Sequence, residues 1–528
     1  MVKFSKPGTP RPRTTRLNAR LTLIAWVLAW FILSLVGCNL PPVSLNGSAG
    51  QPGISSFQLT ALPTIPPSSA ILIPTAGVEV KPSPTVIPTH QTPFLYITQA
   101  GDSLPALAAR FGVKPGDISA GKPLPAEGLL NPGQLLTIPD VLGETSPATR
   151  ILPDGEVVYS PTTLDFDIKS YVKDAGGYLS TYTDYVNNST HSGAEIVQII
   201  AQENSINPRL LLALLQYQSN WVLGQPGNLA QSEYPLGNLD INFRGLYGQL
   251  NWAIRQLSIG YYGWRAGTLT QVTFPDRTTL RLSPEPSAGT VAAQYFFSRM
   301  YNRREWSSVL YSEQGFSALY EKMFDNPWVR ARPFEPFFPP NLTQPTLELP
   351  FYYDQTWSYT GGPHDAWGVD SPLAAIDFAP GSTESGCVPS QAWVLAAAPG
   401  LVIRSDNGVV MVDLDGDGYE QTGWVLLYLH IGSDKRVILG TRLNRDDVIG
   451  HPSCEGGLAT GTHFHIARKY NGEWILADGP LPFTLSGWRV HAGSKEYEGT
   501  LTKDGKTITA CTCGSADTKI IRPKLAGP

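Results

Sequence analysis

Several features are scarce or missing in this chain of 528 residues, and each narrows what the protein does. The 39 basic and 44 acidic side chains leave a net charge of −5, which gives no reason to expect a nucleic-acid partner. The sequence contains no Ser-His-Asp signature and no phosphate-binding loop, so those two chemistries have no support. Histidine is rare, with eight residues in all, and a local group of histidines is therefore informative.

Proline and glycine, by contrast, are abundant. The 46 prolines and 51 glycines indicate linkers, and the length alone suggests about three domains. We therefore expect a multidomain chain with a small α+β module, an α-helical middle region and a C-terminal antiparallel β domain. The expected parts are a signal segment over 1–38, a Pro/Ser/Thr-rich linker over 39–93, the module over 94–139, a linker over 140–165, the helical region over 166–330, a Pro-rich linker over 331–350, the β domain over 351–500 and a loose polar tail over 501–528.

The N-terminus has the composition of a secretion signal. Residues 1–20 carry six basic side chains and no acidic one, and residues 21–36 are almost wholly apolar. The segment ends in Leu35-Val36-Gly37-Cys38, which resembles a bacterial lipobox and implies lipidation of Cys38; the alternative is an uncleaved transmembrane anchor. Either way we expect an extracytoplasmic, membrane-tethered protein. The eleven prolines of 39–93 predict a semi-extended spacer that reaches toward a cell wall.

Residues 94–139 predict a compact module of the order strand, helix, helix, strand. Gly101-Asp102-Ser103-Leu104 is typical of a turn with a helix cap, and a second short helix is expected to begin at Asp117. Asn131-Pro132-Gly133-Gln134 predicts a turn before the last strand. This order and these motifs resemble the LysM module, which implies binding of glycans that contain N-acetylglucosamine. The alternative is a small spacer domain that binds nothing.

The helical region carries a second, weaker resemblance. Residues 206–219 resemble the start of a lysozyme-like lytic transglycosylase domain, in which a catalytic Glu precedes the position of Ser219. Here that position is Gln218, and Glu203 is expected on the preceding helix, away from it. We therefore expect a region that does not cleave glycan. An unrelated helical bundle is the alternative.

The stretch of 461–467 carries the strongest chemical signal. It holds His463 and His465, and its small and apolar neighbours suit a strand. On a strand, residues i and i+2 point to the same face, roughly 7 Å apart. One imidazole there is able to bind a metal ion while the other stands beside the water that the metal activates.

Upstream residues supply the rest of a metal site. His364 follows a Gly-Gly-Pro sequence, and Asp377 lies in an apolar stretch. Two histidines and one aspartate form a normal catalytic zinc set, because three protein ligands leave one position open. The stretch of 424–431 predicts a buried strand with Leu426, Tyr428 and His430 on one face.

At this point the residues resemble the lysostaphin-type, LytM-like zinc metallopeptidases of peptidase family M23. The resemblance covers about 350–490 and implies zinc bound by His364, Asp377 and His465, with His463 and His430 as the catalytic pair. That family usually has three residues between its early histidine and its aspartate, whereas twelve stand here. The insertion contains Asp370, so Asp370 is the alternative carboxylate ligand.

Two further features of the β domain lead to expectations. The oxidising setting of an exported protein favours a disulfide between Cys387 and Cys454, while Cys511 and Cys513 either pair or stay free. The acidic sequence of 413–418 resembles the first half of a calcium loop. Trp424 occupies the position that needs Glu, so we expect a charged hairpin turn instead.

Together these expectations describe a lipid-anchored cell-envelope protein. The function expected is zinc-dependent hydrolysis of the peptide cross-links of peptidoglycan, with glycan binding through the LysM-like module and no nucleic-acid partner. The alternative is a catalytically silent scaffold that binds the wall or activates other hydrolases. The oligomeric state is left open.

Overall fold

The structure is a computed structural model that describes residues 92–368, 370–382, 384–513 and 515–524. The signal segment with Cys38 and nearly all of the linker over 39–93 lie outside the described residues. In the part of the chain that is described, no helix is both long and apolar enough to span a membrane.

The N-terminal module is a three-stranded antiparallel sheet in the order β1-β3-β2 with one helix against it. Its core contains the buried side chains of Tyr96, Leu107 and Phe111. The second helix expected at Asp117 is wrong, because the chain makes one 3-10 turn over Pro115–Asp117 and then enters a strand. Gly116, Gly121 and Pro123 all disfavour a helix here. The elements are β1 (Phe94–Ile97), α2 (Leu104–Phe111), β2 (Ser119–Ala120) and β3 (Leu135–Ile138).

The middle region is helical as expected, and most of its helices, though not α7 and α10, begin at side-chain caps. Ser192 and Glu195 form a capping box, and Asn207 caps the next helix just before Pro208. The elements are α3 (Ile168–Ala175), the hairpin of β4 (Thr183–Val186) and β5 (Ser189–Ser192), α4 (Gly193–Asn204), α5 (Pro208–Ser219), α6 (Leu229–Glu233), α7 (Gly245–Ala266), the hairpin of β6 (Gln271–Thr273) and β7 (Thr279–Arg281), α8 (Ala288–Ser298), α9 (Arg303–Tyr311), α10 (Phe316–Phe324) and α11 (Pro327–Ala331).

The two linkers expected beside this region are, in large part, packed segments. Leu152 and Val157 lie fully buried within the core that the helices share. Phe337 belongs to the same core, and Leu349 is buried in the β domain. Proline content predicted linkers at these places, but the apolar side chains between the prolines anchor the chain.

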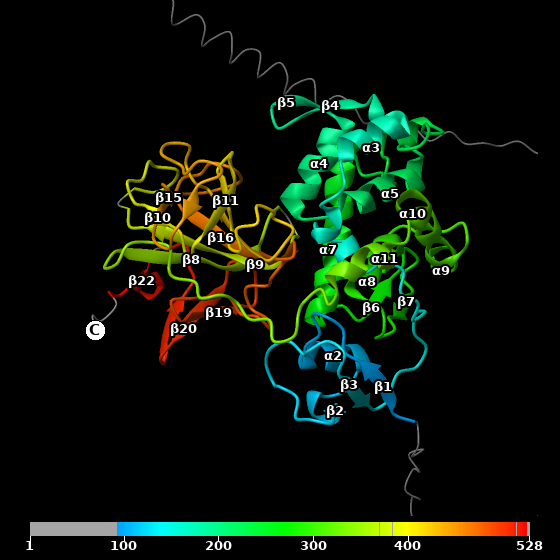
Figure 1. Cartoon of the computed structure of the whole chain (residues 1–528), viewed down its shortest axis with the longest axis horizontal. Coiled ribbons are helices and arrows are strands. Elements are labelled where there is room, and N and C mark those ends of the chain that lie inside the picture. The colour runs from blue at the N-terminus through cyan, green and yellow to red at the C-terminus, as the bar shows by residue number, and fades with distance from the viewer. Residues whose placement is uncertain (1–91, 369, 383, 514, 525–528) are drawn as a thin grey trace, which may run out of the picture. The chain divides into compact units, whose positions relative to one another are not determined.

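The C-terminal domain is built on a nine-stranded antiparallel sheet in the order β14-β11-β12-β13-β16-β9-β8-β22, with β17 paired to β16. Figure 1 shows β8, β9 and β16 within this sheet. A two-stranded sheet of β10 and β15 and a four-stranded sheet of β18 to β21 complete the domain. The bounds are β8 (Thr356–Asp365), β9 (Leu373–Pro380), β10 (Val394–Leu395), β11 (Gly400–Asp406), β12 (Val409–Asp413), β13 (Trp424–Leu429), β14 (Arg442–Leu443), β15 (Val448–Gly450), β16 (Phe464–Tyr470), β17 (Glu473–Trp474), β18 (Thr484–Leu485), β19 (Trp488–Ala492), β20 (Gly499–Lys503), β21 (Lys506–Thr509) and β22 (Lys519–Ile521).

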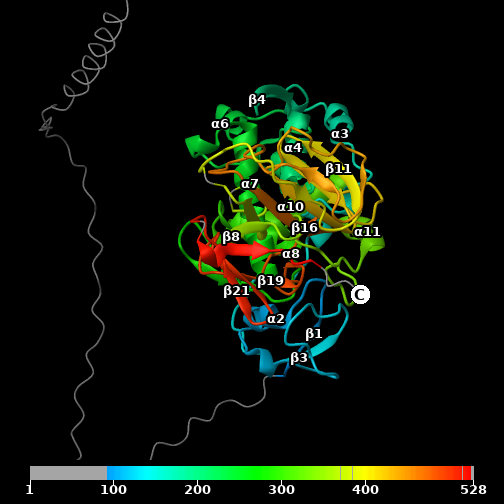
Figure 2. The same ribbon diagram turned by 90° about the vertical axis from the view of Figure 1, so that its left-hand side faces the viewer.

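The loose tail expected from about residue 500 is also wrong. β20 and β21 form a hairpin that continues the sheet of β19, which Figure 2 shows in red and orange, and β22 pairs with β8. Leu501, Ile508 and Ile520 are buried. These isolated apolar residues among polar neighbours are the inward-facing positions of short strands.

The large sheet packs on both faces. One face, with Phe378, Tyr428 and Phe464, is buried within the β domain. The other face, with Ala375, Leu427 and Ala467, belongs to the same hydrophobic core as the helices of the middle region. The middle region and the large sheet are therefore joined by continuous apolar packing, in addition to polar contacts described below.

Candidate metal centre and active site

Three of the predicted ligands converge at the ends of neighbouring strands. His465 of β16 lies opposite Asp377 of β9 in the sheet register, and Asp377 lies opposite Gly361 of β8, three residues before His364. His364 Nε2 lies 3.2 Å from Asp377 Oδ1 and 3.0 Å from His465 Nδ1, and His465 Nδ1 lies 3.4 Å from that carboxylate oxygen. All three side chains are buried. Their ligating atoms form a cluster that is suited to one metal ion.

The structure brings Asp377, and not Asp370, to this cluster. Asp370 lies in the insertion between β8 and β9 and forms an ion pair with Arg255 of α7. Strand pairing thus sets which aspartate lies beside the histidines, because Asp377 is held next to His465 by the ladder between β9 and β16.

Backbone carbonyls determine which imidazole nitrogens face the cluster. His364 Nδ1 donates to Gly362 O at 2.8 Å, and His465 Nε2 donates to Ala366 O at 3.1 Å. A carbonyl only accepts, so each of these nitrogens carries hydrogen. His364 Nε2 and His465 Nδ1 are then left to face Asp377, which is the usual way in which metal-binding histidines are oriented.

The charge balance also fits a cation. Burial alone would raise the pKa of the Asp377 carboxyl, but the charge of His364 and its hydrogen bond hold that pKa well below its usual range. Burial alone would lower the pKa of His364, yet the Asp377 charge raises it.

Ligand atoms at about 2.0–2.1 Å from a tetrahedral zinc ion lie roughly 3.3 Å from one another. The three separations therefore match the donor set of a zinc site.

The predicted catalytic pair lies beside this cluster. His463 Nε2 is 3.7 Å from Asp377 Oδ2, and the rings of His463 and His430 are 4.5 Å apart between centroids. Their Nδ1 atoms donate to the carbonyls of Gly461 at 2.7 Å and Glu455 at 2.8 Å, so both Nε2 atoms are free to accept a proton. Burial, with the neighbouring His463 and His465, lowers the pKa of His430 to about 4.

The expectation that His430 shares a face with Tyr428 is wrong. Tyr428 points to the opposite side of the sheet, where its hydroxyl accepts from Ala397 N at 2.8 Å. His430 follows the end of β13 with φ of +62°, and this left-handed conformation turns its ring toward His463. Strand alternation predicts side-chain direction only while the chain remains extended.

Three residues of this region were missed at the level of sequence. Tyr497, in the connection between β19 and β20, stacks on His364 with centroids 4.2 Å apart and an interplanar angle of 18°. Glu203 of α4 and Tyr247 of α7 line the cleft in front of the metal cluster. No local pattern marks them, because they reach the site through contacts between distant segments.

The cleft has a volume of about 1780 Å³, and two loops on its rim are joined by the disulfide of Cys387 and Cys454. The S–S distance is 2.00 Å, and Thr462 N donates to Gly386 O at 3.1 Å beside it. Cys511 and Cys513 also pair. The disulfide therefore ties the loop that precedes His463 to the neighbouring loop that contains Gly386.

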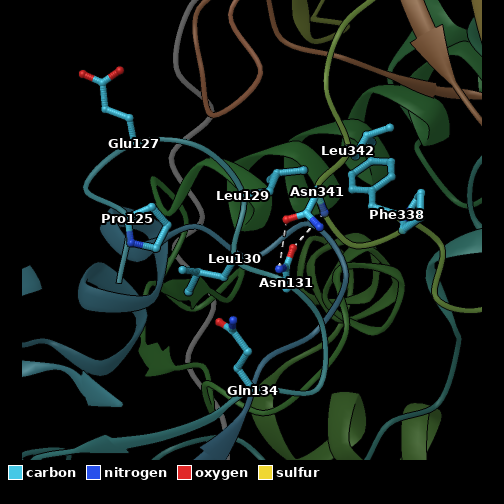
Figure 3. A pocket seen from close by; sticks show the side chains of 10 residues that line it. Pro125, Glu127, Leu129, Leu130, Asn131, Gln134, Phe338, Asn341 and Leu342 are labelled. Atoms are coloured by element: carbon cyan, nitrogen blue, oxygen red, sulfur yellow. Dashed lines mark hydrogen bonds between the residues drawn. The ribbon is translucent and has the colours of Figure 1, made fainter. Parts of the chain in front are cut away.

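Two other places have ligand-like features. The carboxylates of Asp413, Asp415 and Asp417 lie close together, but Asp413 accepts from the backbone of Asp415 and Gly418 within its own hairpin, as a charged turn does. A pocket of about 240 Å³ lies between the module and the segment of 338–342, where Asn131 and Asn341 are joined by hydrogen bonds of 2.8 and 3.2 Å (Figure 3).

The fold and the cluster define a class in structural terms, that of an antiparallel β-sheet domain with a buried group of two histidines and one aspartate that could hold a metal ion. Comparison with known sequences then gives particular relatives. The chain is 24% identical over 391 residues to protease LasA of Pseudomonas aeruginosa, across 68% of this chain and 82% of that protein. It is 26% identical over 167 residues to the beta-lytic metalloendopeptidase of Lysobacter enzymogenes, across 30% of this chain and 90% of that protein.

A family model adds detail for the helical region. Residues 150–337 match the family described as LasA, N-terminal domain. Among solved structures, the M23 metalloprotease pseudoalterin matches 32% of this chain and 96% of its own chain, with 24% identity and a TM-score of 0.27. In sequence, the chain is thus similar to protease LasA and to the beta-lytic metalloendopeptidases. The resemblances of the module to LysM and of the helical region to lysozyme stay predictions.

Proposed function

We propose that this protein is a zinc-dependent endopeptidase that cleaves the peptide cross-links of peptidoglycan. The observation that carries the proposal is the convergence of His364 Nε2, His465 Nδ1 and Asp377 Oδ1 within 3.4 Å of one another, in buried positions and oriented by backbone carbonyls. The homology with metalloendopeptidases supports the same reaction class. The open cleft in front of the cluster is large enough for an extended peptide.

The residues beside the cluster supply the proton transfers. When bound, zinc would polarise the scissile carbonyl and lower the pKa of a water molecule toward about 7. His463 is the nearer base, with its Nε2 3.7 Å from Asp377 and its Nδ1 fixed by Gly461. His430 is neutral at pH 7, and its ring lies 4.5 Å from the His463 ring between centroids. Either imidazole, once protonated, stabilises negative charge that develops on the substrate oxygen.

The surrounding parts suit an insoluble substrate. Lipidation of Cys38 would tether the chain, and the spacer of 39–93 would carry the folded parts toward the wall. The module of 94–139 would add glycan binding of the LysM type. Deletion of the corresponding segment would separate each of these roles from the peptidase activity.

The test uses the purified chain from residue 92 onward with defined cross-linked muropeptides and product masses as the readout. We expect about one zinc ion per chain and products cut in the peptide. His465→Ala should lose the metal, because two ligands hold zinc poorly, whereas His463→Ala should keep the metal and lose about 10²–10⁴ in rate. Zinc-loaded wild-type protein that leaves every muropeptide intact would show instead that the site is silent.

A further inference from the structure

The insertion between His364 and Asp377 is docked on the helical region. Ala366 is fully buried in the core that the sheet shares with the helices, and Trp367 packs against the same core. Asp370 forms its ion pair with Arg255, which lies near the middle of α7. The insertion is therefore held by a helix that lies more than 100 residues earlier in the chain.

The same insertion orients a predicted metal ligand through its backbone. His465 Nε2 donates to Ala366 O at 3.1 Å, which leaves His465 Nδ1 for the metal. His364 and His463 use carbonyls two residues away, at Gly362 and Gly461. His465 depends on a carbonyl 99 residues away, so its orientation depends on where the insertion lies.

The helical region also holds the other end of strand β16. Glu473 of β17, which pairs with Tyr470 at the end of that strand, accepts from Tyr261 at 2.6 Å and pairs with Arg265 at 3.0 Å. Ser205 Oγ donates to Gly472 O at 2.6 Å. The strand that carries His465 is thus fastened to the helices at its far end and at its catalytic end.

We propose that Arg255 is a positioning residue for the metal centre. It holds Asp370, and the insertion in turn holds the Ala366 carbonyl against His465 Nε2, so that His465 Nδ1 faces the metal. The helical region then shapes the metal centre itself and is more than a neighbouring domain. This inference rests on the proposed function for its consequence in activity, but the orientation of the ring is testable without metal.

The experiment compares wild-type protein with Arg255→Ala, Arg255→Lys, Asp370→Asn and the double variant Arg255→Ala/Asp370→Asn, each as the chain from residue 92 onward. Asp370 has φ of +59°, which asparagine tolerates, so Asp370→Asn removes the charge without backbone strain. The control is Arg244→Ala. Arg244 pairs with Glu233 in the same region, with similar exposure of the two side chains, 55% and 30% against 42% and 30%.

Two readouts are taken. In metal-free protein labelled with ¹⁵N-histidine, NMR reports which nitrogen of His465 carries hydrogen; in zinc-loaded protein, competition with a chelator gives the zinc Kd. We expect Arg255→Ala and Asp370→Asn to increase the Nδ1–H form of His465 and to weaken zinc binding by about two- to fivefold, the range for a partly exposed ion pair. Arg255→Lys should recover part of the effect, and the double variant should be no worse than either single one.

The inference is overturned if Arg255→Ala leaves both the His465 signals and the zinc Kd unchanged. It is also overturned if Arg244→Ala changes them equally. If Arg255→Ala does not fold, Asp370→Asn decides the matter by the same two readouts. If the wild-type protein binds no zinc while the NMR shift appears as expected, the proposed function fails and the positioning role stands.

Discussion

Gly361 lies directly opposite Asp377 in the pairing of β8 with β9, and a Cβ atom at residue 361 would lie 2.6 Å from Asp377 Oδ2. The carboxylate occupies the space that any larger residue at 361 would need. Only glycine leaves Asp377 free to face His364 and His465.

Gly361→Ala should therefore weaken zinc binding, because the added methyl group must displace the Asp377 carboxylate. We expect a loss of at least about tenfold in affinity, within the range for disturbed support of metal ligands. Chelator competition measures it. The control is Gly479→Ala, where the nearest atom to a new Cβ lies at 3.4 Å. Equal zinc affinity in the two variants would contradict the close approach.

Lys469 should make stability depend on pH in the alkaline range. Burial lowers the pKa of Lys469 from 10.5 to about 8, with Glu420 opposing the shift and Arg404 adding to it. Between pH 8 and 10.5 the unfolded chain binds the proton that the folded chain has released, so the free energy of unfolding rises with pH across that window. Below pH 8 the folded protein carries the buried Lys469 charge, and the full destabilisation that this charge causes is present. Lys469→Met should add up to about 3 kcal/mol at pH 7.

Urea unfolding at pH 7 and at pH 9.5 checks this prediction. The gain of Lys469→Met over wild type should shrink at the higher pH, since the folded wild-type protein no longer carries the buried charge there. Lys173→Met, at an exposed position, is the control. A gain that is the same at both pH values would speak against the lowered pKa.

The disulfide of Cys387 and Cys454 should matter for both stability and turnover. It closes a sequence separation of 67 residues, for which the chain-entropy account gives about 4 kcal/mol of stabilisation. Cys387→Ser/Cys454→Ser should lower the Tm and the rate, because the rim loop before His463 loses its tie. Cys511→Ser/Cys513→Ser spans two residues and should change little. An unchanged Tm and rate in Cys387→Ser/Cys454→Ser would show that the rim is held by other contacts, and equal losses in the two double variants would show that the effect is not specific to the rim.

The helical region should not cleave glycan. Gln218 accepts from the Tyr301 hydroxyl at 2.9 Å, and an amide has no titratable proton with which to protonate a leaving oxygen. Glu203 lines the cleft of the metal centre instead. His463→Ala in the chain from residue 92 onward should thus release no anhydro-muropeptides from sacculi. Such products, lost again in Glu203→Gln, would reveal a second active site.

Much of the site was predictable from local sequence. The spacing of His463 and His465 places both imidazoles on one face wherever the chain is a strand, and β16 is that strand from Phe464 onward. The helical character of the middle region and strand β13, within the stretch of 424–431, also follow from local side-chain patterns. These features depend on neighbours within a few residues, which the sequence alone determines.

Tertiary structure decided the rest. The place of Asp377 beside His465 comes from strand register, the turn of His430 out of its strand from a left-handed backbone, and the stacking of Tyr497 on His364 from a distant loop. The contact of Ala366 with His465 joins residues 99 positions apart. Such relationships depend on which segments pair and pack in three dimensions. A pattern of nearby residues does not specify which distant segments pair.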